Sequence, residues 1–215
     1  MAVEFDGGVV VGADSRTTTG QFVANRVTDK LTRLSDTIYC CRSGSAADTQ
    51  LVADVVSTYL DMLETEQNEA PTVAIAANLA KSFVYGNKDY LLASLIIAGY
   101  DAQSKGSVYT VSLGGTILKQ PYAIGGSGSS YIYGFCDSNF KPGMTAEQCR
   151  AFVATGTLYF GQGFLIFDLA LAHAMARDGS SGGVVRLATI DSSGVNKTMI
   201  PGDQLPYLVD SRTND

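Results

Sequence analysis

Two consecutive helical segments interrupt a series of strand-like runs, and this order constrains the fold more than any other feature. Apolar residues recur at helical spacing between residues 51 and 63, with Ser45 and Asp48 as candidate caps near the start. A second helical pattern opens at Pro71 and runs through Tyr85. Strands are predicted for five β-branched or apolar runs: residues 9–11, 37–41, 91–98, 107–113 and 184–190. This order predicts an α+β fold in which helices cover mainly antiparallel sheets, and it leaves the strand order open.

A further helix is expected to begin near Thr145, which resembles an N-cap, and helical spacing resumes at residues 169–176. Three glycines interrupt what would otherwise be one helix over residues 147–175. We expect residues 155–168 to be an atypical insertion, which the family resemblance given below also implies, because about fourteen extra residues separate Ser127 from Asp178. As a functional loop it would expose an apolar patch to a partner. The alternative, a gene-model artefact such as a translated intron, is the interpretation that we favour.

Composition indicates a packed globular protein and argues against several partners. Of the 215 residues, 46% are hydrophobic and 17% are charged, so residues 1–215 can form a single domain with a substantial core. The net charge of −6 includes no basic patch, which argues against nucleic acid as a partner. Neither an apolar run long enough to span a membrane nor a secretion-signal pattern is present, so we expect no membrane association.

The cysteines indicate the compartment. Their spacing does not match a zinc site, and we expect no metal site. Cys40 and Cys41 are adjacent in a predicted strand, so their side chains should point to opposite faces. The four cysteines are Cys40, Cys41, Cys136 and Cys149. Reduced thiols fit a protein of the cytoplasm and nucleus.

Five short segments contain the residues that could carry chemistry. They are Gly-Ala-Asp-Ser-Arg-Thr-Thr-Thr-Gly (12–20), Thr-Asp-Lys (28–30), Arg-Ser-Gly-Ser-Ala-Ala-Asp (42–48), Gly-Gly-Ser-Gly-Ser (125–129) and Asp-Gly-Ser-Ser-Gly-Gly (178–183). Each alone has an ordinary interpretation: Asp14 is a turn residue, Lys30 a surface ammonium, and Arg42 a structural partner for a carboxylate. The glycine-rich segment 125–129 lacks the pattern of a phosphate-binding loop. In this order, however, the five segments resemble the catalytic β1-type subunits of the eukaryotic 20S proteasome.

The resemblance implies the four-layer αββα sandwich of N-terminal nucleophile hydrolases and threonine-type peptidase activity without a cofactor. In that family the mature chain begins with a threonine and two further residues ahead of the segment that matches residues 1–3. Since this sequence does not contain those three residues, the chain as given is expected to be inactive. The family's catalytic positions match Asp14, Lys30, Gly44, Ser127, Asp178 and Ser181. His173, within an alanine-rich helical pattern, is expected to be structural, which disfavours a histidine triad.

The resemblance also assigns roles to these positions. Asp14 would orient Lys30, whose charge favours the alkoxide and the deprotonated amine of the nucleophile. The backbone N–H of Gly44 would stabilise the oxyanion. Ser127, Ser181 and Asp178 would hold the terminal amine.

A substrate pocket is implied as well. The matching positions are Thr17, Thr28, Thr32, Arg42, Ala46 and Gln50, and Thr18 would join Gly44 and Ala46 in pairing with the substrate backbone. Arg42 is the only formal charge among them, and a guanidinium pairs bidentately with carboxylates, so cleavage after acidic residues is expected. The immune-type homologue carries an apolar residue there, so the resemblance indicates the constitutive β1 type.

The expected partners are other proteasome α and β subunits and unfolded, typically ubiquitin-tagged, polypeptides. Two alternatives remain. One is a noncatalytic structural subunit of the same particle, and the other is an unrelated amidase with the same fold. The joint presence of Asp14, Lys30, Arg42, Ser127 and Asp178 favours the catalytic design.

Overall fold

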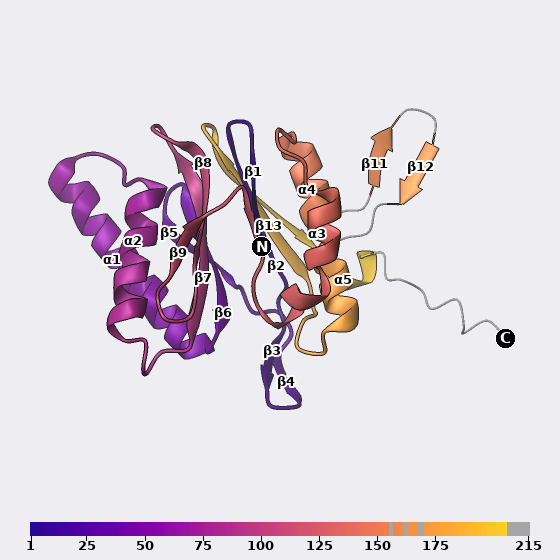
Figure 1. The fold of residues 1–215 in the computed structure, drawn as a ribbon, viewed down its shortest axis with the longest axis horizontal. Helices are drawn as coiled ribbons and strands as arrows, with labels where there is room; N and C mark the ends of the chain where they lie inside the picture. The colour runs from indigo at the N-terminus through magenta and orange to yellow at the C-terminus, as the bar shows by residue number, and fades with distance from the viewer. Residues whose placement is uncertain (155–156, 161–162, 167–169, 206–215) are drawn as a thin grey trace.

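The computed structural model describes residues 1–154, 157–160, 163–166 and 170–205, and these form four layers (Figure 1). Two antiparallel five-stranded sheets lie face to face. Two helices cover the outer face of one sheet, and three shorter helices cover the outer face of the other. The predicted α+β fold, an αββα sandwich, is confirmed.

The first sheet holds the N-terminal strand near its centre, in the order β10-β1-β2-β13-β14. Its strands are β1 (Ala2–Phe5), β2 (Gly8–Ala13), β10 (Tyr122–Ala123), β13 (Val185–Asp191) and β14 (Gly194–Ile200). The second sheet has the order β5-β6-β7-β8-β9. Its strands are β5 (Leu31–Ser35), β6 (Ile38–Gly44), β7 (Ala93–Asp101), β8 (Lys105–Val111) and β9 (Ile117–Lys119).

The helices fall into two groups on either side of the paired sheets. On the second sheet lie α1 (Ala46–Gln67) and α2 (Val73–Gly86). On the first sheet lie α3 (Tyr133–Asn139), α4 (Ala146–Ala154) and α5 (Ala170–Arg177). Two short 3-10 helices complete the described elements, η1 (Ser127–Tyr131) and η2 (Gly202–Gln204). Among the described residues, no helix combines the length and apolar character that crossing a bilayer requires.

Three apolar clusters fill the spaces between the four layers. One lies between α1, α2 and the second sheet, one between the two sheets, and one between the first sheet and α3 to α5. Cys40 belongs to the first of these and Cys41 to the second, so their predicted opposite orientation is confirmed. Burial raises the pKa of both thiols, which keeps them protonated at neutral pH.

Helix starts follow local capping chemistry, with one correction. Ser45 caps α1 by accepting a 3.3 Å hydrogen bond from the Asp48 N–H, whereas the Asp48 carboxylate accepts the N–H of Leu92 at 3.0 Å. The expectation that Pro71 opens the second helix is wrong. Thr72 is the N-cap there, and its hydroxyl accepts a hydrogen bond from Ile75.

The predicted cap at Thr145 is confirmed by a reciprocal capping box. The backbone N–H of Thr145 donates to the Gln148 side chain at 2.9 Å, and the Gln148 N–H donates to the Thr145 hydroxyl at 3.2 Å. The first helix begins at Ala46, several residues before the apolar pattern from residue 51, because cap chemistry and not apolar spacing determines the first turn.

The segment expected to be an insertion separates α4 from α5. Within it, β11 (Thr157–Phe160) and β12 (Gly163–Ile166) pair as an antiparallel hairpin that extends away from the helices in Figure 1. Residues 155–156, 161–162 and 167–168 of the expected insertion lie outside the described residues. Leu169, where we expected helical spacing to resume, also lies outside them, and α5 begins at Ala170.

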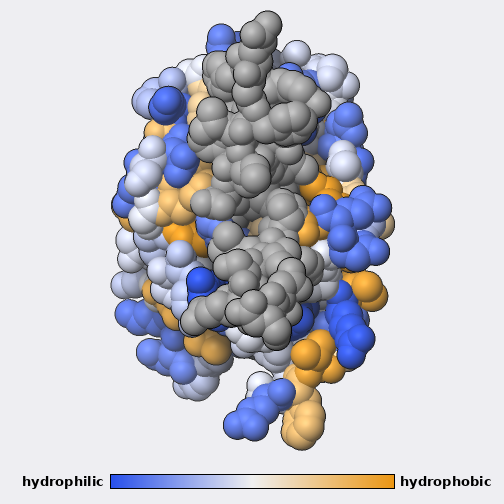
Figure 2. Space-filling view, turned by 90° about the vertical axis from the view of Figure 1, so that its right-hand side faces the viewer, coloured by the Kyte–Doolittle hydropathy of each residue, from blue (hydrophilic) through white to orange (hydrophobic). Residues whose placement is uncertain are grey.

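A second hairpin projects from the sandwich at the lower edge of Figures 1 and 2. It consists of β3 (Thr17–Thr19) and β4 (Phe22–Asn25). Phe22 at its tip is 81% exposed. The base of this hairpin contributes threonines to the cavity described next.

Candidate active site

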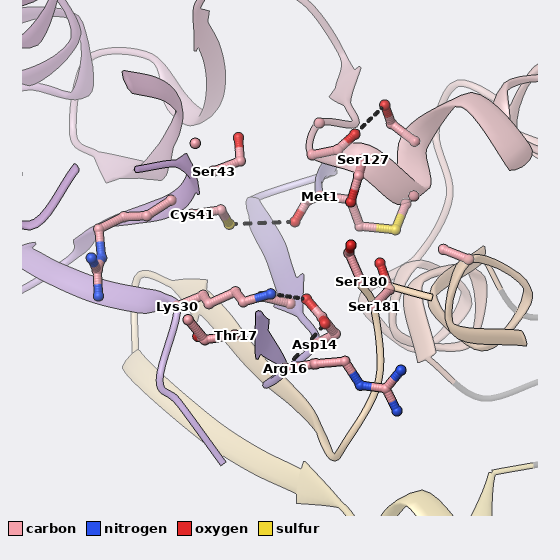
Figure 3. Close-up of a pocket in the computed structure, with 18 of the residues that line it drawn as sticks. Met1, Asp14, Arg16, Thr17, Lys30, Cys41, Ser43, Ser127, Ser180 and Ser181 are labelled. Atoms are coloured by element: carbon pink, nitrogen blue, oxygen red, sulfur yellow. Dashed lines mark hydrogen bonds and ion pairs between the residues drawn. The ribbon is translucent and has the colours of Figure 1, made fainter. Parts of the chain in front are cut away.

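A cavity of about 410 Å³ lies where the start of β1 and the ends of β2 and β6 meet two loops (Figure 3). The loops contain residues 125–129 and 178–181, which lie 81 or more positions further along the chain than the end of β6 at Gly44. Eleven of the thirteen predicted site residues line it: Asp14, Thr17, Thr18, Thr28, Lys30, Arg42, Gly44, Ala46, Gln50, Ser127 and Ser181. The other two, Thr32 and Asp178, contact residues of the lining.

Lys30 and Asp14 form an ion pair at the cavity floor. Lys30 Nζ lies 2.6 Å from Asp14 Oδ1, and the two side chains are only 23% and 13% exposed. The second carboxylate oxygen of Asp14 accepts the backbone N–H groups of Gly182 at 3.0 Å and Arg16 at 3.3 Å. Because both oxygens of Asp14 are engaged, the carboxylate is fixed and the ammonium of Lys30 is held in one place.

A second carboxylate, Asp178, organises the opposite wall. Its Oδ2 accepts hydrogen bonds from the hydroxyls of Ser127 at 2.6 Å and Ser181 at 2.5 Å, and its Oδ1 accepts the Ser180 N–H at 3.1 Å. Partial burial acts to raise the pKa of Asp178, but these hydrogen bonds and the charge of Lys30 outweigh it, so the pKa lies below the usual value. Asp178 is therefore ionised at neutral pH.

Close packing at Gly128 lets this wall form. A side chain at this position would place its Cβ 2.8 Å from Ser181 Oγ and 2.9 Å from the Ala174 methyl group. Glycine allows the 125–129 loop to approach the start of the loop that follows α5. The glycine-rich segment thus serves close backbone approach.

Arg42, in β6, extends into another part of the cavity and is held by neutral oxygens. Its Nε donates to the Thr32 hydroxyl at 2.8 Å, and its Nη2 donates to the Asp29 carbonyl at 3.2 Å. Its Nη1 lies 3.3 Å from the Thr49 hydroxyl and 3.4 Å from the Ala46 carbonyl. Within the described part of the chain, no carboxylate lies at ion-pair distance from the guanidinium. The alternative of a structural carboxylate partner finds no support there.

The hydrogen-bond register of β6 determines which way the backbone of Gly44 faces. Ser45 N donates to the carbonyl of Leu92, the residue before β7, and Arg42 N donates to the carbonyl of Lys30 on the other side. Since N–H directions alternate along a strand, the Gly44 N–H points to the Lys30 side, away from β7. Gly44 has φ +110°, and a Cβ there would lie 2.3 Å from the Leu92 carbonyl oxygen. Glycine is therefore required at this turn.

Thr17 and Thr28 close the side of the cavity next to Arg42 and Lys30. Their hydroxyl oxygens lie 2.8 Å apart, which joins the base of the β3–β4 hairpin to the segment before β5. His173 does not line the cavity, and its ring packs edge-on against Phe135 with centroids 5.6 Å apart. Among the described residues, no three His, Cys, Asp or Glu side chains gather so as to hold a metal ion.

Several residues that shape the cavity were missed from the sequence. Thr49, buried in the first turn of α1, touches Arg42, and the Ser45 cap would have placed it one turn into the helix beside the strand end. Met1 and Cys41 also line the cavity, as does Arg16, whose guanidinium donates to the Gly179 carbonyl at 2.9 Å. No role was predicted for these three: strand pairing places Met1 and Cys41, and Arg16 lies in the segment between β2 and β3.

Comparison with known proteins now identifies the family. A model described as proteasome subunit matches residues 1–190, most of the chain. The chain belongs to the proteasome subunit family. Catalytic members of this family are threonine-type peptidases, and the family supports a role in protein degradation.

This proteasome subunit is similar to several eukaryotic β-type subunits. It is 55% identical over 206 residues to proteasome subunit beta type-6 of Dictyostelium discoideum, covering 96% of this chain and 90% of that protein. It is 49% identical over 208 residues to proteasome subunit beta type-1 of Saccharomyces cerevisiae, with 97% and 90% covered. It is also 49% identical over 210 residues to proteasome subunit beta type-9 of Mus platythrix, with 98% and 89% covered. The relatives agree on a β-type subunit and differ in the type number.

Proposed function

We propose that this chain is the constitutive β1-type subunit of the 20S core, a threonine-type endopeptidase that cleaves after acidic residues in unfolded, typically ubiquitin-tagged, proteins. The observation that carries this proposal is the Arg42 guanidinium, which faces the cavity that holds the Lys30–Asp14 pair and is bound to neutral oxygens. A positive charge without a carboxylate partner among the described residues favours an anionic substrate side chain.

The register of β1 supports a nucleophile ahead of Met1. The Met1 amino group donates to the Gly12 carbonyl at 2.7 Å, and the Gly12 N–H donates back to Met1 at 2.9 Å. Continuing this antiparallel ladder, the third residue before Met1 would lie opposite Ser15, about 10 Å further along the strand. In Figure 3, Met1 lies beside Ser127 and above the space between Lys30 and Ser181. We infer that a threonine at that position would enter the space between them.

The proposed reaction is acyl transfer by this threonine. Its hydroxyl attacks the peptide carbonyl while its own α-amine accepts the proton. That proton passes to the leaving amine as the peptide C–N bond breaks, and water then hydrolyses the ester and releases the acyl group. Lys30, oriented by Asp14, favours the deprotonated forms of both groups. The Gly44 N–H would donate to the oxyanion, an interaction that typically contributes about 3 kcal/mol. Ser127, Ser181 and Asp178 would hold the amine.

A second candidate is a noncatalytic structural β subunit of the same particle. The similar proteins carry different type numbers, so the comparison does not assign this chain to a particular catalytic β type. In either case we propose that the chain assembles with other proteasome α and β subunits and acts in the cytoplasm and nucleus.

Assembled 20S particles separate the two candidates. The subunit is expressed behind a cleavable propeptide in three forms: with Thr-Thr-Ile ahead of Met1, with Ala-Thr-Ile ahead of Met1, and beginning at Met1. We expect cleavage after Glu or Asp only with the first form, because loss of the nucleophile typically costs about 10⁶ in rate. Equal acidic cleavage in all three contradicts the N-terminal nucleophile. Inactivity in all three favours the structural subunit.

A further inference from the structure

We propose that Thr49 is a positioning residue for Arg42, and that the guanidinium so held offers an acidic substrate side chain its charge and a single N–H. This inference rests on the proposed function, because it concerns the same acidic specificity. Thr49 lies in the first turn of α1, outside the set of residues that the motifs identify.

The hydroxyl of Thr49 has an enforced orientation. Thr49 is 2% exposed, and its Oγ1 donates to the Ser45 carbonyl at 2.8 Å, with the Ala46 carbonyl at 3.2 Å. A hydroxyl has one hydrogen, so once it is donated to the helix the oxygen can only accept. Arg42 Nη1 lies 3.3 Å away as the donor. The capped start of α1 thereby fixes one end of the guanidinium.

Three chain segments hold the guanidinium together. Thr32 of β5 accepts from Nε, the Asp29 carbonyl before β5 accepts from Nη2, and the first turn of α1 accepts from Nη1 through Thr49 and Ala46. An arginine has five N–H donors. Nε, Nη1 and Nη2 each donate to the protein, and one of the two hydrogens on Nη2 has no acceptor among the described residues.

This count refines the expectation of a bidentate pair. Two parallel hydrogen bonds to a carboxylate would have to use, beside Nη2, either Nε or Nη1, and both of these already donate to protein oxygens. With the observed contacts kept, a substrate carboxylate is recognised by proximity to the charge and by one hydrogen bond from Nη2. Orientation then matters, because a rotated guanidinium would turn that hydrogen away from the substrate.

The test is a Thr49→Val substitution in assembled 20S particles that carry the threonine-led subunit. Valine keeps the shape and removes the acceptor. The measured quantity is the ratio of kcat/KM for a peptide with Glu at the cleaved position to that for a matched Leu peptide. We expect this ratio to fall about tenfold, the lower end for a hydrogen bond to a charged group. The fall should come from a higher KM for the Glu peptide.

Matched variants separate positioning from general destabilisation. Thr49→Ser retains the hydroxyl and should recover most of the ratio. Thr58→Val removes a hydroxyl that likewise donates to the carbonyl four residues earlier, at 2.9 Å, but that lies on the exposed part of α1, and it should leave the ratio unchanged. A merely structural effect would reduce the amount of active subunit and lower both peptides equally. If valine prevents assembly, Thr49→Ala, which only removes atoms, replaces it in the same comparison.

The outcomes distinguish this inference from the proposed function. If Arg42→Leu collapses the ratio and Thr49→Val does not change it, the positioning role is overturned while the acidic specificity stands. A loss in Thr49→Ser as large as in Thr49→Val also overturns the role, since the hydroxyl would then be irrelevant. If Arg42→Leu itself leaves the ratio unchanged, the proposed acidic specificity fails.

Discussion

Replacing Arg42 with leucine removes the one formal charge among the predicted pocket residues and is the most direct perturbation of the proposed specificity. The guanidinium is partly buried in the cavity lining. A carboxylate about 4 Å from it would gain roughly 4 kcal/mol at the effective dielectric constant of such sites. Desolvation of both groups reduces this gain. We expect a net loss of about 2 to 3 kcal/mol, or roughly 30- to 150-fold in kcat/KM for peptides with Glu at the cleaved position.

The same substitution should favour apolar substrates. Leucine would present methyl groups where the charge was, so hydrolysis after Leu should rise as hydrolysis after Glu falls. The assay uses assembled 20S particles and paired fluorogenic Glu and Leu peptides. Because both rates come from one preparation, their ratio does not depend on how much subunit is active.

A surface arginine provides the matched control. Arg33 lies in β5, pairs with Asp36 at 2.5 Å, and has a side chain that is 53% exposed. Arg33→Leu removes the same charge from the same sheet outside the cavity and should leave the ratio unchanged. An unchanged Glu peptide rate in Arg42→Leu particles, with normal assembly, would refute the assignment of Arg42 to substrate recognition.

Three further predictions concern the scaffold. Gly44→Ala should lower thermal stability by more than about 2 kcal/mol, because its Cβ would lie 2.3 Å from the Leu92 carbonyl at a positive φ; a melting temperature equal to that of the parent would contradict this. The pKa of Asp178 is lower in the folded state than its ordinary value of 3.8, so the stability it contributes is present above that pH and is lost as the pH falls through the folded value. Asp178→Asn should therefore reduce the slope of stability against pH below about pH 4, and parallel slopes in thermal unfolding would exclude this role. Finally, we expect the mature transcript to lack the codons for residues 155–168, because α4 and α5 flank this segment and pack into one apolar cluster; a message that encodes the whole segment would show that it is a true insertion.

Much of the fold could be predicted because short-range patterns of apolar and capping residues indicate its helices and strands. The apolar runs predicted β2, β6, β7, β8 and β13, and the helical spacing predicted α1 and α2. Buried strands are nearly continuous in apolar residues, so they are visible without knowledge of their partners. Cap chemistry located the starts at Ser45 and Thr145 for the same local reason.

The elements that were missed depend on pairing. β14 has no fully buried residue, and β10 has only two residues that become a strand by pairing with β1. β5, with the sequence Leu-Thr-Arg-Leu-Ser, has only two apolar residues and no alternation, so it could not be distinguished from a loop. Edge strands of this kind carry little apolar signal, because one side faces solvent or a loop. Pro71 was misassigned because a proline is compatible with both the first helical turn and the extended residue before a cap.

The sequence by itself determined the α+β class, the membership of the motifs and the chemical types available at the site, whereas the four-layer sandwich was expected from the family resemblance. Periodicity and capping are properties of neighbouring residues, so they can be recognised in the sequence without the structure. Only the tertiary structure decided that Lys30 pairs with Asp14 in the cavity that Ser127, held by Asp178, also lines, and that Thr49 supports Arg42. These contacts depend on the register of paired strands, on where α1 begins and on how the loops close. Each of these is fixed by apolar packing between segments that are far apart in the sequence. The preferences of neighbouring residues do not predict contacts between distant segments. The Thr49 hydroxyl could therefore be recognised as an acceptor for Arg42 only in the folded structure.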